Sequence, residues 1–416
     1  MIKIMKTKWI QPLIALFFIV LLSILTIFLK STNLRLSLII SFILGCVISR
    51  SSFDFSTGIK QAYLYKNTNL TKAFILLLAL SMIIVFILKI IFDFYNINLI
   101  SNISNTNNIS IFTLVGSFII GFSIIITSNC ASGILFDLAK GKLKGLIGVI
   151  FFIIGSVIGY ISLKLFSKTN LFIKTSSKVF LANNIYYLAI LICSLLILFV
   201  LYLIVKKYEN KYLKQDFNLK INNNLNDQLI NNSSKKLFSY KNYYRLFIKN
   251  WSFMISSVLI SICATIILVI NNKTWGVSKP FLTFFVYLCS VFKINLSNVM
   301  FDEIIKITNN GLLNDSSTLI NISFFIGCLV CFLLANKFKF ELKINKKEFF
   351  CFTIGGFLLG FGASLANGCS VGAMYSKIST FDLSGWVFLI GMIIGIFIGI
   401  KIFIKKQNNI IQINRR

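Results

Sequence analysis

The stretch GFGASLANGCSVGAM, from Gly360 to Met374, decides the fold, because it places glycines and a cysteine where a lipid-facing helix would carry leucine. It lies among long apolar runs such as LIALFFIVLLSILTIFL, from Leu13 to Leu29. About 20 apolar residues span a bilayer as a helix, whereas a β-barrel needs short alternating segments. We therefore predict an all-α, polytopic integral membrane protein with about 10 transmembrane helices plus broken or half helices.

The apolar segments also indicate how the chain is divided. They fall at approximately 10–29, 35–49, 73–92, 110–128, 145–165, 185–205, 251–270, 280–292, 317–335, 349–367 and 385–404. The stretch 206–249 is rich in Asn and Lys, a composition typical of linkers. We expect a first transmembrane repeat over 1–205 with an extra N-terminal helix at 10–29, a polar cytoplasmic linker over 206–249, and a second transmembrane repeat over 250–416.

Composition excludes several function classes. The chain is 57% hydrophobic and only 13% charged, and its net charge of +30 comes from lysines between apolar runs, where the positive-inside rule places them. We therefore expect a lipid bilayer around the chain and no nucleic-acid partner. The sequence has no histidine and no phosphate-binding loop of the G-x-x-x-x-G-K-[ST] type, so we predict neither a metal site nor an ATPase, and no cofactor.

A glycine-rich segment occurs twice. GSFIIGFSIIITSNCASG, Gly116–Gly133, aligns with GGFLLGFGASLANGCSVG, Gly355–Gly372, and the alignment continues, after one residue of slip, with Gly145 over Gly385. Such duplications are the basis of many transporters. The loop charges of the two halves have opposite signs at corresponding places, which favours inverted halves with both termini inside the cell.

Each copy of this segment predicts a broken helix. A long apolar run leads to Cys130 or to Cys369, and only a short mixed segment follows. Breaks inside a membrane are tolerated where protein or a polar cavity satisfies the backbone, and helix N-termini attract anions. We therefore predict that Cys130 and Cys369 face one another across a narrow gate near the midplane.

The other cysteines leave alternatives open. Cys328 and Cys331 form a C-x-x-C pair on one helix face, which in an apolar run is typical of packing but also fits a membrane thiol–disulfide or sulphur-transfer enzyme. A soft-metal transporter is the third hypothesis. The lack of histidine and of Met-rich motifs in the sequence argues against it. We interpret five cysteines as packing residues: Cys46, Cys193, Cys263, Cys289 and Cys351.

The repeated segments resemble those of YeeE/YedE membrane proteins, the sulphur transport family. GFGASLANGCSVGAM is similar to the second family signature, and GFSIIITSNCASGILFDLAKGK, Gly121–Lys142, to the first. SRSSFDF, Ser49–Phe55, and WGVSKPF, Trp275–Phe281, resemble two further family stretches. The resemblance runs from about residue 35 to 404, apart from the linker.

The resemblance implies a transporter, not an enzyme, which imports thiosulfate or a related sulphur anion across the inner membrane. It also implies an hourglass-shaped monomer, passage by transient contacts with successive thiols, and a TusA-like cytoplasmic sulphur carrier as partner. A selenium-species transporter stays open, and Asp54 stands where many relatives have a cysteine. Cys328 and Cys331 are the candidates for a third pathway cysteine. The expected substrate path comprises Cys130, Cys369, Cys328, Cys331, Asn129, Gly133, Gly368 and Gly372.

Overall fold

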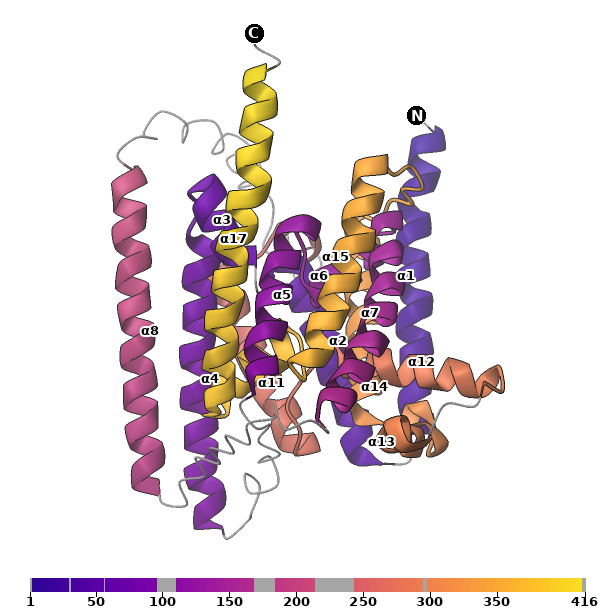
Figure 1. The fold of residues 1–416 in the computed structure, drawn as a ribbon. Helices are drawn as coiled ribbons and strands as arrows, with labels where there is room; N and C mark the ends of the chain where they lie inside the picture. Colours follow the sequence, from indigo (N-terminus) through magenta and orange to yellow (C-terminus); the bar gives the residue numbers. More distant parts are fainter. Residues whose placement is uncertain are drawn as a thin grey trace, which may run out of the picture.

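The computed structural model describes residues 2–29, 31–55, 57–95, 110–167, 184–213, 243–294 and 298–413. Within these ranges the chain is helical, and its one strand-like feature is an isolated β-bridge between Lys142 and Glu341. Figure 1 shows most of the helices running side by side as a bundle, with α8 at one edge. The all-α prediction is therefore confirmed.

The helices before residue 214 are α1 (Ile2–Phe28), α2 (Thr32–Ser51), α3 (Thr57–Tyr65), α4 (Asn69–Phe94), α5 (Ile111–Thr127), α6 (Ala131–Ala139), α7 (Leu143–Ser167) and α8 (Asn184–Leu213). Those after residue 242 are η2 (Tyr244–Ile248), α11 (Phe253–Asn271), α12 (Lys279–Val291), α13 (Asn298–Asn309), η3 (Leu312–Asn314), α14 (Ser316–Leu334), α15 (Lys346–Leu365), η4 (Ser370–Tyr375), α16 (Ser376–Ser379) and α17 (Leu383–Ile413).

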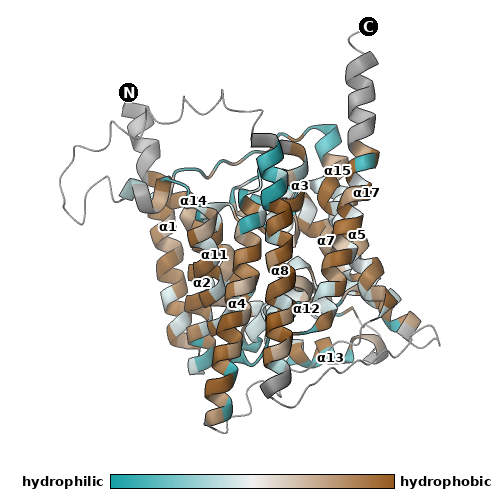
Figure 2. Cartoon of the chain, turned by 90° about the vertical axis from the view of Figure 1, so that its left-hand side faces the viewer, coloured by the Kyte–Doolittle hydropathy of each residue, from teal (hydrophilic) through white to brown (hydrophobic). Residues whose placement is uncertain are grey.

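Ten of the described helical segments are long and apolar enough to cross a membrane. Figure 2 shows hydrophobic residues along most of α4 and α8, with hydrophilic residues gathered near the upper end of α8. The predicted number of spans is therefore confirmed, and the chain is a multi-pass membrane protein. The segment predicted at 280–292 forms the 13-residue helix α12, which is shorter than any of the ten spans.

Both glycine-rich segments are broken helices. α5 ends at Ser128, whose φ of 60° is left-handed, and α6 begins after Cys130. α15 ends before Asn367, whose φ of 55° is also left-handed, and η4 begins after Cys369. A left-handed residue turns the backbone out of the helix, so one helix ends and another begins within each segment. The predicted broken helices are confirmed.

The two broken segments run in opposite directions. The loop after α6 pairs with the loop before α15: Leu143 N–H donates to the carbonyl of Glu341, and Lys339 N–H donates to that of Lys140. α6 therefore ends where α15 begins. In Figure 1 the start of α1 and the end of α17 also share one end of the bundle, while α13 lies at the other.

Each broken segment packs against the other half of the chain: α5 lies against α17, and α15 lies against α7. The contacts recur at aligned positions. A Cβ added at Gly121 would overlap the carbonyl oxygen of Met392, and one added at Gly360 would overlap that of Phe152. Gly121 aligns with Gly360 and Phe152 with Met392, so the same backbone contact is made twice. Glycine permits this close approach of helix backbones.

Helix α8 extends into the first part of the predicted linker. α8 continues past Val205 to Leu213, and in this extension Glu209 forms an ion pair with Lys72 of α4 while Tyr208 accepts a hydrogen bond from Lys66. Residues 214–242, most of the predicted linker, lie outside the described residues.

Candidate functional site

Cys130 and Cys369 occupy equivalent positions in the two broken segments. Cys130 has φ −92° and ψ −174° and precedes α6; Cys369 has φ −87° and ψ −175° and precedes η4. Their exposed fractions are 1% and 2%, so neither side chain faces lipid. The extended backbone at each position directs the first N–H groups of a half-helix towards the break, and such groups favour anions.

The two thiols belong to one buried core cluster. Cys130 lies within electrostatic range of both Cys369 and the carboxylate of Asp54. Its Sγ also lies 2.9 Å from the hydroxyl oxygen of Ser132, the second residue after it. Both cysteines that the sequence analysis paired are therefore buried in the same core, each directly before a half-helix.

A polar cavity of about 240 Å³ lies beside the first break, and we call it the α3 cavity. Its lining includes Asn129, Ser132 and Gly133 from the break, together with Asp54 and Lys60. Burial lowers the pKa of Lys60, and the nearby charge of Asp54 partly offsets this effect. The cavity thus places one cation and one carboxylate beside the Cys130 break.

A second polar cavity, of about 490 Å³, lies beside the other break, and we call it the α13 cavity. Gly368 and Gly372 line it, together with Lys273, Lys279 and Lys377. Burial lowers the pKa of Lys279, and the charges of Lys377 and Lys273 lower it further. Residues of α3 line the first cavity and Ile307 of α13 lines the second, and these helices lie at opposite ends of the bundle (Figure 1).

Aromatic rings pack together next to both cavities. The ring centroid of Phe55 lies 5.7 Å from that of Trp275 and 5.5 Å from that of Tyr375. Phe55 follows Asp54 of the α3 cavity, and Trp275 precedes Gly276 of the α13 cavity. All three rings are almost completely buried. This layer of rings is therefore adjacent in sequence to a lining residue of each cavity.

Asn129 is fixed by a buried carboxylate. Its Nδ2 donates to Asp137 at 2.6 Å, and Asp137 also lies 3.7 Å from the ammonium groups of Lys142 and Lys144. Asp137 is 6% exposed, so its charge is compensated by these neighbours rather than by water. The carboxylate thus orients the residue immediately before Cys130.

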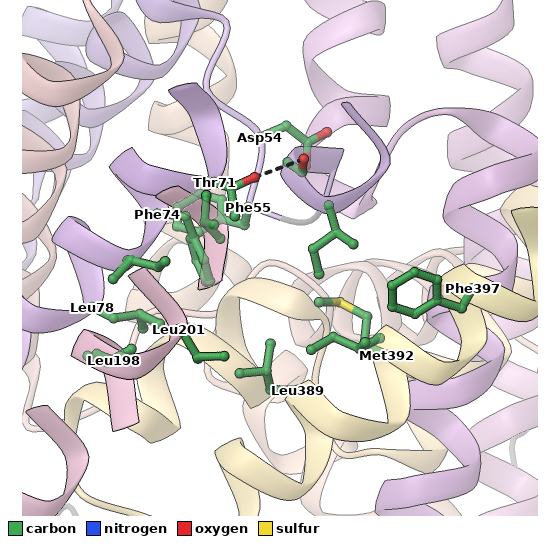
Figure 3. Close-up of a pocket in the computed structure, with 15 residues that line it drawn as sticks. Asp54, Phe55, Thr71, Phe74, Leu78, Leu198, Leu201, Leu389, Met392 and Phe397 are labelled. Atoms are coloured by element: carbon green, nitrogen blue, oxygen red, sulfur yellow. Dashed lines mark hydrogen bonds between the residues drawn. The ribbon is translucent and has the colours of Figure 1, made fainter. Parts of the chain in front are cut away.

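A third cavity, of about 190 Å³, differs in chemistry from these two (Figure 3). It lies among α3, α4, α8 and α17, and its lining is apolar apart from Asp54 and Thr71. The hydroxyl of Thr71 is engaged with the carbonyl of Gly58 at 3.0 Å. This cavity offers little to an anion, so the two lysine-bearing cavities form the candidate site.

Comparison with known proteins is decisive at this point, because the model of the sulphur transport family matches residues 50–398, which include both breaks and the residues named from both polar cavities. The chain belongs to the sulphur transport family. It is 28% identical over 154 residues to "Probable transporter YedE" of Escherichia coli K12. It is 25% identical over 154 residues to the protein of that name from Salmonella typhimurium LT2. Each match covers 37% of this chain and only 38% of the relative.

In this member of the sulphur transport family, Cys328 and Cys331 lie apart from both polar cavities. Both are buried in α14 at its contact with α2, and neither lines the α3 or the α13 cavity. The Cys328 thiol donates to the carbonyl of Gly45 at 3.2 Å. Of the eight predicted path residues, four line a cavity, two are the buried thiols at the breaks, and these two lie elsewhere.

The sequence analysis missed the cavity cations and the aromatic layer. Lys60, Lys273 and Lys279 lie between apolar runs, where lysine is expected for topological reasons alone. Trp275 and Phe55 were noticed only within family-like stretches. A usable signal was present, because Lys279 lies inside one of those stretches and Lys60 and Lys273 lie within two helical turns of them.

Proposed function

We propose that this protein imports thiosulfate, or a related small sulphur-containing anion, across the inner membrane through a constriction formed at Cys130 and Cys369. One observation carries the proposal. Each thiol precedes a half-helix with the same extended backbone, and the residues beside each thiol line a different polar cavity. An anion that moved between the cavities along the two breaks would pass both sulphur atoms.

The charges around the site support an anionic substrate. Lys60 lines one cavity together with Asp54. Lys273, Lys279 and Lys377 line the other together with Asp315, so this cavity carries an excess of positive charge. The half-helix N-termini add partial positive charge at the breaks. Thiols are weak, polarisable donors, so they would hold a soft sulphur atom without trapping it.

We further propose that 1–205 and 250–416 are duplicated, inverted halves joined by the linker 206–249. The opposite directions of the two broken segments and the recurring glycine contacts support this division. In transporters with inverted repeats the substrate site lies at the interface between the repeats. Cys130 and Cys369 would occupy that interface.

The orientation and partner follow from the same proposal. The loops 139–145 and 336–348 lie at the end of the bundle that carries the start of α1 and the end of α17, and they are rich in lysine. The positive-inside rule then makes this end cytoplasmic. A TusA-like sulphur carrier would receive the anion there, and the transporter would act as a monomer.

Growth and uptake test the proposal. Cells that depend on this protein should grow with thiosulfate as the sole sulphur source, and Cys130→Ala and Cys369→Ala should each abolish growth and uptake. Cys193→Ala is the matched control, because Cys193 is exposed on α8 and should be dispensable. Membrane levels of all variants are measured by immunoblot.

Three results would overturn parts of the proposal. Normal thiosulfate uptake in both cysteine variants would remove the thiols from the path. The transporter would instead be assigned to selenium species if selenite blocked the uptake of labelled thiosulfate and the protein bound selenite more tightly than thiosulfate. Detergent-purified protein eluting as a dimer would reject the monomer.

A further inference from the structure

α2 and α14 touch along their backbones. A Cβ added at Gly45 would overlap the carbonyl oxygen of Phe324, and one added at Gly327 would overlap that of Phe42. Both glycines thus remove the side chains that would hold the helices apart. Short side chains near this crossing can therefore meet directly across the helix interface.

Three cysteines lie at this crossing. The Cys46 thiol donates to the carbonyl of Gly327 at 3.5 Å, and the Cys328 thiol donates to that of Gly45. Cys331 lies one helical turn after Gly327 on α14, on the same helix face, so its side chain lies next to the carbonyl that the Cys46 thiol contacts. All three are free thiols. The crossing therefore brings Cys46 of α2 close to Cys331 of α14.

A buried arginine lies beside this pair. Arg50, one turn after Cys46 on α2, is 3% exposed and interacts electrostatically with Cys46 and Cys331. Its Nη2 donates to the carbonyl of Lys249 at 2.5 Å, but its buried Nε has no hydrogen-bond partner. A thiolate, rather than a thiol, attacks disulfides, and a neighbouring guanidinium stabilises a thiolate. The cluster thus combines two neighbouring thiols with an incompletely satisfied cation.

We propose that Cys46 and Cys331 are a redox-modification site, at which a low-molecular-weight disulfide converts the two thiols into a reversible bridge between α2 and α14. Cys46 is half-buried and Cys331 is almost completely buried, so Cys46 reacts first. This site is separate from the cavities, and the proposal does not depend on which anion is transported.

The exchange proceeds in two balanced steps. The Cys46 thiolate attacks one sulphur of the oxidant, whose S–S bond breaks, giving a mixed disulfide and one released thiol. Cys331 then attacks the Cys46 sulphur, forming the protein S–S bond and releasing the second thiol. The two protein protons end on the two released thiols. An excess of a reducing dithiol reverses both steps.

The position of the pair along the chain makes a sharp test possible. A protease cleavage sequence inserted between Leu213 and Tyr243 separates Cys46 from Cys331 after cutting. Membranes are treated with 2,2′-dithiodipyridine, remaining thiols are blocked with N-ethylmaleimide, and the cut protein is run on a denaturing gel. We expect the two halves to migrate together without reductant and to separate completely with dithiothreitol.

Single-serine variants identify the bridge. Cys46→Ser and Cys331→Ser should each abolish the joined species, whereas Cys328→Ser and Cys369→Ser should retain it. Peptide mass spectrometry of the oxidised wild type should find the Cys46–Cys331 link, which keeps the test decisive if a serine variant misfolds. Separated wild-type halves, a bridge that survives Cys46→Ser, or one that is lost in Cys369→Ser would each overturn the proposal.

Discussion

The ammonium group of Lys60 donates a hydrogen bond to the hydroxyl of Ser128 at 2.6 Å, and so links α3 to the break that ends α5. The same nitrogen lies 3.4 Å from the carbonyl oxygen of Ile125, in the last turn of α5. Lys60 therefore brings a positive charge to the side of the Cys130 break that lines the α3 cavity. A sulphur anion entering this cavity would meet that charge before it reached a thiol.

The titration of these cavity lysines predicts an alkaline limit on uptake. Burial lowers the pKa of Lys60 and of Lys279, so both lose their protons at a lower pH than an exposed lysine does. Because the protonated form attracts the anion, KM for thiosulfate should rise as pH increases through the lowered pKa values. Uptake into proteoliposomes measured from neutral to alkaline pH would show the rise.

Arginine at these two positions provides the control, because its guanidinium stays protonated throughout this range. Lys60→Arg together with Lys279→Arg should move the rise in KM to higher pH, while Lys60→Met should raise KM about tenfold already at neutral pH, equivalent to roughly 1.4 kcal/mol. A pH profile of the double arginine variant that coincides with that of the wild type would contradict this explanation.

Close backbone contacts at Gly121 and Gly360 predict intolerance of even one methyl group. An added Cβ would overlap a carbonyl oxygen of the facing helix, which cannot rotate away as a side chain can. Gly121→Ala and Gly360→Ala should each destabilise the protein by about 1–3 kcal/mol or more, as overpacking does. Thermal unfolding in detergent measures the loss.

Gly58→Ala is the matched control for these variants. At Gly58 the nearest atom to an added Cβ lies 3.4 Å away, so the methyl group fits with little adjustment. This variant should keep the wild-type midpoint within a few degrees. Equal midpoints for Gly121→Ala, Gly360→Ala and the wild type would show that the helices can separate to accept a side chain.

The spans and the helix breaks could be predicted from sequence because both depend on local chemistry. Lipid selects apolar residues over a whole helix, and the Gly-rich segments around Cys130 and Cys369 mark where the helix stops. Each left-handed residue, Ser128 or Asn367, stands two residues before its cysteine, so one short stretch of sequence marks both the break and the thiol. For these reasons α5, α6 and α15 were predicted close to where they occur.

The pairing of side chains across helices was not predictable in this way. Spacing in GCLVC placed Cys328 and Cys331 on one helix face, but it gave no sign that the close contact of α2 with α14 would bring Cys46 to the same face. That contact joins residues from opposite halves of the chain, and no local pattern encodes it. The ion pair between Lys72 and Glu209, which accompanies the extension of α8 beyond the apolar run, is equally non-local.

Asp137 should be a second position, besides the thiols, at which a substitution reduces uptake. It accepts a hydrogen bond from Asn129, and a hydrogen bond to a charged group contributes about 1.5–3 kcal/mol. Asp137→Ala should free Asn129 and reduce thiosulfate uptake by more than tenfold, whereas Asp137→Asn offers an amide oxygen and should retain more activity. Equal uptake by Asp137→Ala and the wild type, at equal membrane level, would remove this role.

The aromatic layer formed by Phe55, Trp275 and Tyr375 predicts a leak when it is thinned. Phe55 contacts both other rings, so Phe55→Ala removes the ring that joins them and leaves a void. Water and small anions could then pass between the α3 and α13 cavities without contacting the thiols. Sulfate, which lacks a soft terminal sulphur, should enter proteoliposomes several-fold faster in Phe55→Ala than in the wild type.

Phe397→Ala separates this effect from the general loss of a phenylalanine. Phe397 is 43% exposed on α17, packs against Tyr63 and lines the apolar third cavity rather than the α3 or the α13 cavity, so its removal should leave sulfate exclusion unchanged. Truncation of a buried Phe costs about 3–5 kcal/mol, so the Phe55→Ala protein must be shown to be folded by its elution profile. If the folded Phe55→Ala protein still excluded sulfate, the aromatic layer would not be the barrier. The barrier would then lie at Cys130 and Cys369.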